Sequence, residues 1–145
     1  NYTMMGDTVN LAARLEPAAK HYGVYIFVSE HTQKAVKDLF EWRFIDYLRV
    51  KGKNKPVKGY ELISLKNEMS DDQSQLVQAF DEGVNFYKKQ EWTKAKKRFK
   101  DSLSMEEKFI DRPTTPSAVY LDRCDYFKAE PPGKDWDGIW TMKTK

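Results

Sequence analysis

The chain has 145 residues, with 25 Lys and Arg against 22 Asp and Glu, giving a formal net charge of +3. Hydrophobic residues make up 40% and aromatic residues 14%, which is enough for a core and excludes a chain that is disordered throughout. So small a net charge does not indicate nucleic acid or an anionic membrane as a partner. The single cysteine excludes an internal disulfide framework and favours a reducing, cytoplasmic setting.

The first predicted element is a helix over residues 8–21, preceded by Gly6, whose lack of a Cβ permits a tight turn. Its apolar side chains recur at helical spacing and form one stripe: Leu11, Leu15, Ala18 and Ala19. Asn10 and Arg14 lie four residues apart, so both side chains can reach one phosphate-bearing ligand near the helix N-terminus. The residues alone leave open that both belong to a solvated polar face. Gly23 is available to cap the helix C-terminus.

Four further elements follow in the first half of the chain. Residues 24–28, rich in Val, Ile and aromatic side chains, predict a buried strand, and Ser29 with Glu30 opens a short helix. Partial alternation over 41–50 predicts a half-buried strand, and residues 57–64 return as its hairpin partner. The order helix, strand, helix, β-hairpin predicts the later part of an α+β domain. Its sheet keeps an exposed edge unless further strands complete it.

The predicted hairpin turn over residues 51–56 is basic. Lys51, Lys53 and Lys55 surround Gly52 there, and several ammonium groups close together suit a triphosphate. The residues alone favour an exposed turn of solvated lysines.

A resemblance adds to these observations. The run GDTVNLAARLE, residues 6–16, resembles the signature of the class III adenylate/guanylate cyclase catalytic domain. Residues 24–30 and 49–62 follow in the order that this family shows, so the resemblance covers residues 1–65. It implies a partial ferredoxin-like cyclase domain whose parent protein converts ATP to cyclic AMP and pyrophosphate in intracellular signalling.

The resemblance also implies roles for four residues. Thr3 lies three residues before the motif glycine, where the family places the side chain that contacts the purine of ATP. Asn10 would orient the ribose as a catalytic residue, and Arg14 would stabilise charge on the phosphates in the transition state. Lys51 matches the family pattern as a triphosphate contact, whereas Lys53 is a weaker match.

The chain departs from the family pattern at the metal site. The family uses two Asp residues to bind two Mg or Mn ions, together with a purine-contacting Lys, and none of them can be matched in this sequence. Their place is upstream of this chain, so no metal ligand is assigned within it and the chain alone is expected to be inactive. The family builds its site between two catalytic domains, which implies a second cyclase domain as homodimer partner.

The start of the chain predicts that it is a fragment. Asn1 is not an initiator Met, and it opens within a predicted strand–turn–helix unit. No apolar run is long enough to span a bilayer. Any membrane anchor of the parent protein is therefore expected upstream.

The second half is predicted to be helical. Residues 66–74 are polar and predict a linker, followed by a helical domain over 75–145. Two helices with apolar faces are expected there. Their apolar residues are Leu76, Phe80, Gly83, Val84 and Tyr87 on the first, and Trp92, Ala95, Phe99 and Leu103 on the second. The small and aromatic positions Gly83, Phe86, Ala95 and Phe99 resemble a tetratricopeptide-type helical hairpin, which needs neighbours to bury its faces.

A third helix over 117–127 and a tail rich in Trp and Pro complete the chain. The tail is expected to pack on the helices, or else to recognise a partner. The arrangement resembles tails of some bacterial cyclases, and we expect a role in regulation or dimer assembly, with a protein as possible partner.

Two other functions stay open at the level of sequence. One is a non-catalytic interaction module that keeps a cyclase remnant. The other is a guanylate cyclase, against which Thr3 argues.

Overall fold

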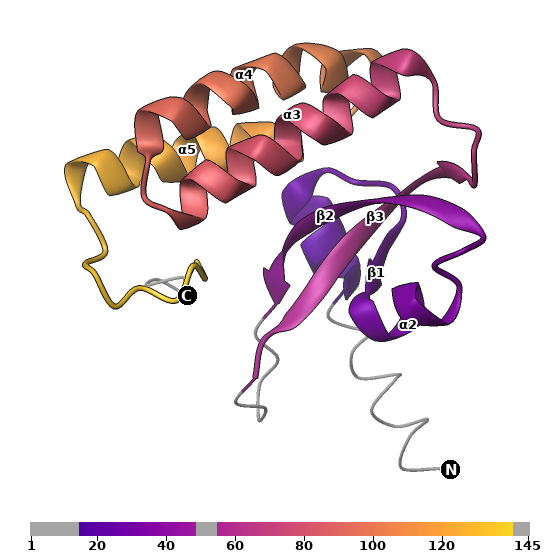
Figure 1. The fold of residues 1–145 in the computed structure, drawn as a ribbon, viewed down its shortest axis with the longest axis horizontal. Helices are drawn as coiled ribbons and strands as arrows, with labels where there is room; N and C mark the ends of the chain where they lie inside the picture. Colours follow the sequence, from indigo (N-terminus) through magenta and orange to yellow (C-terminus); the bar gives the residue numbers. More distant parts are fainter. Residues whose placement is uncertain (1–14, 49–54, 141–145) are drawn as a thin grey trace. The chain divides into compact units, whose positions relative to one another are not determined.

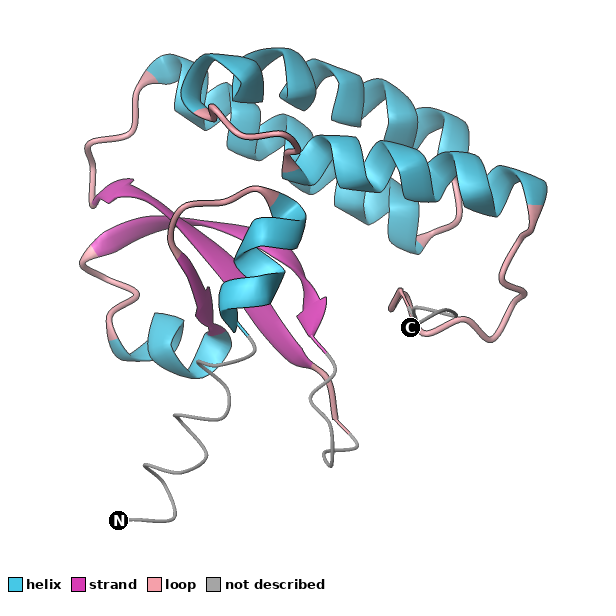
Figure 2. Cartoon of the chain, turned by 180° about the vertical axis from the view of Figure 1, so that it is seen from behind, coloured by secondary structure: helices cyan, strands magenta, loops and turns pink. Residues whose placement is uncertain are grey.

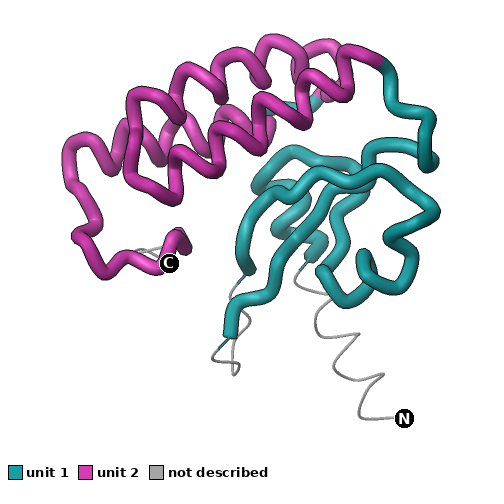
Figure 3. Tube along the Cα trace, in the orientation of Figure 1, with its two compact units in different colours: residues 1–70, 112–114 teal, residues 71–111, 115–145 magenta. Residues whose placement is uncertain are grey.

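The computed structural model describes residues 15–48 and 55–140, and the chain divides into two compact units (Figure 3). Unit 1 comprises residues 1–70 and 112–114, and unit 2 comprises residues 71–111 and 115–145. Together they give the α+β composition that the sequence predicts.

Within its described residues, unit 1 contains a three-stranded antiparallel sheet and two short helices (Figure 1). Its strands are β1 (Phe27–Ser29), β2 (Phe40–Leu48) and β3 (Val57–Leu65), arranged in the order β1-β3-β2. Helix α2 (Glu30–Ala35) connects β1 with β2. Residues 15–22 form a further helix, which lies over one face of the sheet (Figure 2). The predicted hairpin is thus confirmed, with β3 as the central strand.

The ends of both short helices form as the sequence predicts. Gly23 has a φ of +76°, and its N–H and that of Val24 donate to the carbonyl of Ala19 at 2.8 and 3.0 Å. This left-handed cap favours glycine because a Cβ would be strained there. Ser29 caps α2, and its hydroxyl accepts from the N–H of Thr32.

The first strand is shorter than predicted. We expected it from Val24, but β1 begins at Phe27, since the chain is still turning away from the Gly23 cap. Val24 is buried, whereas Tyr25 and Ile26 are about half exposed. The apolar run next to this helix cap is therefore neither a strand nor buried at Tyr25 and Ile26.

A bulge interrupts the alternation of β2. Phe44 faces Tyr60 and Asp46 faces Gly59, so the register of β2 against β3 shifts by one residue at Ile45. An extra residue of this kind shifts the side chains that follow it by one position. As a result Ile45 and Asp46 are both buried, although they are adjacent in sequence.

Unit 2 contains three helices, α3 (Asp71–Lys88), α4 (Trp92–Phe109) and α5 (Pro116–Ala129). Helix α3 begins within the predicted linker, and two acidic residues in its first turn complement the helix dipole. Helix α5 begins one residue before its predicted start, with Thr115 as N-cap and Pro116 in the first turn.

The packing of α3 against α4 needs a residue without a side chain. A Cβ built on Gly83 would lie 2.7 Å from the ring of Phe99, closer than such atoms can approach. The close approach that such a helical hairpin needs between a small and an aromatic residue is therefore present at Gly83 and Phe99. Leu103, predicted on the buried face of α4, is only half-buried, because Ser102 and Glu106 take the buried positions after Phe99.

The tail packs on the helices of its own unit. Trp136 contacts the rings of Tyr87, Trp92 and Phe127 at centroid distances of 5.2, 5.7 and 5.0 Å. Trp140 contacts Phe127 at 5.3 Å. The expected packing of the tail is confirmed, and it extends the aromatic core of unit 2.

Candidate functional site

The four predicted site residues lie outside the described residues. Thr3, Asn10 and Arg14 precede residue 15, and Lys51 falls within 49–54. Their roles stay predictions. The structure does describe the elements that flank them, which are helix 15–22, directly after Arg14, and the two strands of the hairpin whose turn contains Lys51.

A buried carboxylate joins these two flanking elements. The hydroxyl of Tyr22, at the end of helix 15–22, donates a hydrogen bond to Oδ2 of Asp46 in β2. Oδ1 of Asp46 accepts from the backbone N–H of Tyr47 at 2.8 Å. Asp46 is 3% exposed and Tyr22 5% exposed. The β2 bulge places Asp46 there, so the alternation of the sequence could not have revealed this contact.

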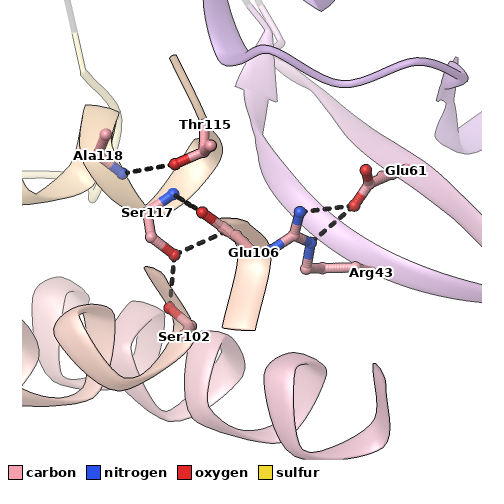
Figure 4. A network of polar contacts seen from close by, with 7 residues as sticks. All are labelled: Arg43, Glu61, Ser102, Glu106, Thr115, Ser117 and Ala118. Atoms are coloured by element: carbon pink, nitrogen blue, oxygen red, sulfur yellow. Dashed lines mark hydrogen bonds and ion pairs between the residues drawn. The ribbon is translucent and has the colours of Figure 1, made fainter. Parts of the chain in front are cut away.

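A second polar pair crosses the hairpin. Nε and Nη2 of Arg43 both lie near Oε1 of Glu61, at 2.8 and 2.6 Å, and the two residues face each other in the β2–β3 register (Figure 4). Arg43 is 1% exposed and Glu61 6% exposed. Such a pair adds more to the uniqueness of the register than to net stability, because removing both charges from water costs nearly what their attraction returns. Sequence reasoning missed the pair, although opposite charges at facing hairpin positions were a usable signal.

The ring of Phe27 packs closely against the backbone of the central strand. The ring of Phe27 lies against Gly59 of β3, where a Cβ would come within 2.3 Å of it. The same ring lies 5.9 Å from that of Tyr22. Phe27 therefore packs between the central strand and the helix that follows Arg14.

The described residues hold no candidate metal centre. Across 15–48 and 55–140, no three His, Cys, Asp or Glu side chains gather closely enough to hold an ion. The side chains in these ranges therefore do not fit the two metals that the resemblance implies. In the same ranges, no helix combines the length and apolar character needed to cross a membrane.

Unit 2 contains a buried carboxylate at the start of α5. Both oxygens of Glu106 lie 3.2 Å from the N–H of Ser117, whose hydroxyl donates to Oε2 at 2.8 Å (Figure 4). The hydroxyl of Ser117 also lies next to that of Ser102. A negative charge at a helix N-terminus interacts favourably with the helix dipole. This cluster joins α4 to α5 and explains why two polar residues occupy the buried face of α4.

The single cysteine is structural. Cys124 is fully buried in α5, and burial raises the pKa of its thiol to about 12. Because the thiolate is the reactive form, a thiol with so high a pKa is a poor nucleophile at neutral pH. Cys124 thus behaves as a small buried hydrophobic residue.

Three curated proteins show similarity to this chain, and all are named adenylate cyclase. A terminal-differentiation-specific adenylate cyclase of Dictyostelium discoideum is 32% identical over 128 residues, which cover 84% of this chain and 6% of that protein. Adenylate cyclase 1 of Rhizobium meliloti is 36% identical over 64 residues, covering 44% of this chain and 10% of its relative. An adenylate cyclase of Anabaena cylindrica is 36% identical over 63 residues, covering 41% and 12%. No family model and no solved structure matches the chain.

The three matches differ in how much of this chain they cover. Coverage of 84% cannot fit within one unit, so the similarity to the Dictyostelium protein runs through parts of both. The chain spans between 6% and 12% of the length of the three relatives. It is therefore related to a small region of proteins named adenylate cyclase.

Proposed function

We propose that this chain is the C-terminal part of a class III adenylate cyclase catalytic domain, followed by a tetratricopeptide-like helical unit. The observation that carries the proposal is its similarity to three adenylate cyclases, in one of which the similarity runs through both units. The parent protein would convert ATP to cyclic AMP and pyrophosphate, and this chain would supply one side of the ATP site.

Four residues would contact the nucleotide. Thr3 would hydrogen-bond to the adenine edge, and Asn10 would orient the ribose. The planar guanidinium of Arg14 suits the phosphates, where it would stabilise the charge that develops as the ribose 3′-hydroxyl attacks the α-phosphate. Lys51 would contact the triphosphate from the hairpin turn as a compact point charge.

The described framework supports this arrangement. In the sequence, Arg14 directly precedes helix 15–22, and Lys51 falls between β2 and β3. The hydrogen bond between Tyr22 and Asp46 fixes that helix against that hairpin. Catalytic groups must be held to within a fraction of an ångström. A buried hydrogen bond between the helix and the hairpin that carry such groups meets this need.

The rest of the site would come from outside this chain. The two Mg or Mn ions need carboxylates that the described residues do not provide, and we place those ligands in the preceding part of the catalytic domain. A second catalytic domain would complete the site as homodimer partner. The chain alone would then be inactive.

The test uses the full-length protein that contains this chain. Cyclic AMP formed from Mn-ATP is measured for the unaltered protein and for the variants Asn10→Ala and Arg14→Ala. Lys20→Ala, at an exposed position of helix 15–22, is the matched control. We expect each site variant to lose on the order of 100-fold in kcat, and the control to keep full turnover.

Two outcomes would overturn the assignment. Full turnover in both site variants would show that the site lies elsewhere. A folded, dimeric protein that is inert with ATP would exclude an adenylate cyclase, and a parallel assay with Mn-GTP would then identify a guanylate cyclase.

A further inference from the structure

A furrow runs along the pair of helices α3 and α4. It consists of two adjoining hollows of about 560 and 340 Å³ that share Glu82 and Arg98 in their walls. The larger hollow lies towards the turn between the helices. All its lining residues belong to unit 2 and to the described part of the chain.

The larger hollow is strongly basic. Its walls carry four cations, Lys89, Lys94, Lys97 and Arg98, against one carboxylate, that of Glu82. Arg98 is engaged with Glu82 at 3.4 Å and with Asp101 at 2.7 Å. Lys94 lies 3.3 Å from Glu91.

The remaining two cations are available to a ligand. Lys89 and Lys97 are both exposed, and within the described residues neither forms an ion pair. Like charges that line one hollow repel each other, and an anionic ligand relieves that repulsion. The charge of the hollow is therefore complementary to a cluster of carboxylates.

The hollow also offers groups that suit a peptide. Phe86 is half-buried in its wall and can receive an apolar side chain, while the exposed amide of Asn85 can both donate to and accept from a peptide backbone. Cations beside an apolar contact and an amide are typical of sites that recognise short charged motifs.

Other occupants fit less well. In a two-fold contact, a second copy would bring the same four cations against their equivalents. A nucleic acid would need exposed aromatic rings on which successive bases stack, and Phe86, the one aromatic residue that lines the hollow, is half-buried. A membrane surface would need exposed apolar side chains, and the large exposed apolar residues of the described chain lie outside this hollow.

We propose that this basic hollow binds an acidic segment of a partner protein, with at least one apolar residue among its carboxylates. Lys89 and Lys97 bind the carboxylates, and Phe86 receives the apolar side chain. This gives unit 2 a role in recruiting a partner, independent of the chemistry assigned to unit 1.

The test measures binding of a labelled peptide to the full chain by fluorescence polarisation. The probe is a Glu-rich peptide of about twelve residues with a central Leu-Phe, and a second peptide has Gln in place of every Glu. The test variant is Lys89→Glu/Lys97→Glu. Its matched control, Lys100→Glu/Lys128→Glu, makes the same change of charge at exposed positions of unit 2 that do not line the hollow. Circular dichroism confirms that all variants are folded.

The proposal expects the acidic peptide to bind, and the binding to weaken as salt increases. The test variant should lose at least about tenfold in affinity and the control less than about twofold. The Gln peptide should bind about tenfold more weakly than the Glu peptide.

Several results would overturn it. These are no binding of the acidic peptide, equal losses in test and control variants, or equal binding of the two peptides. Tighter binding to single-stranded RNA or to phosphatidylserine vesicles, with the same loss in the test variant, would assign the hollow to one of those ligands instead.

Discussion

Each of the two units of this chain is stabilised internally by a different kind of contact. In unit 1, buried polar pairs join one element to the next, Arg43 with Glu61 across the hairpin and Tyr22 with Asp46 between helix and strand. In unit 2, aromatic rings fill most of the core and connect all three helices with the tail, beside the polar cluster of Glu106 and Ser117 that joins α4 to α5. Directional pairs fix the relative positions of elements, whereas an aromatic core tolerates small adjustments. A framework for a catalytic site needs the first property.

The largest expected effect comes from removing one charge of the buried pair in unit 1. Arg43→Met leaves the Glu61 carboxylate buried without its cation, and we expect a loss of about 4 kcal/mol in the free energy of unfolding of unit 1. Urea denaturation followed by the fluorescence of Trp42, the one tryptophan of unit 1, measures it. Arg43→Met/Glu61→Leu should recover most of the loss. A double variant as unstable as the single one would show that the pair matters through packing and not through charge.

A smaller effect is expected where unit 2 is packed most tightly. Gly83→Ala places a methyl group against the ring of Phe99, and we expect a loss of about 2 kcal/mol in the stability of unit 2. Its three tryptophans, Trp92, Trp136 and Trp140, report the unfolding of this unit. Adding Phe99→Leu should return part of the loss by making room. Unchanged stability in Gly83→Ala would mean that the helices separate freely and that the core is less rigid than the structure shows.

The smallest effect concerns the hydrogen bond between Tyr22 and Asp46. Tyr22→Phe keeps the ring against Phe27 but removes the hydroxyl that Asp46 accepts from, and we expect a loss of about 1 kcal/mol in the stability of unit 1. In the full-length protein, it should also lower cyclic AMP formation more than Tyr60→Phe does, because within the described residues the hydroxyl of Tyr60 forms no hydrogen bond to helix 15–22. Equal turnover in the two variants would remove the positioning role of this hydrogen bond.

The sequence predicted most elements of both units because their signals are local. Ser29 and Gly23 stand where helix termini need a side-chain oxygen or a left-handed residue, and each is found at such a terminus. The alternation of β2 and β3 and the apolar face of α3 likewise depend on neighbours close in sequence. The proposed nucleotide contacts came from the resemblance over residues 1–65, and they stay predictions.

Tertiary structure decided the contacts that depend on residues far apart in the chain. The bulge at Ile45 breaks the alternation and moves Asp46 to the buried side, where Tyr22 can reach it. Glu106 is buried because α5 begins beside it and presents an N–H and a hydroxyl to its carboxylate. By itself, the sequence thus determined which segments become helices and strands and indicated the kinship to adenylate cyclases. Only the folded chain decided which charges are buried and which remain at the surface, because the cost of burying a charge depends on the partners that packing provides.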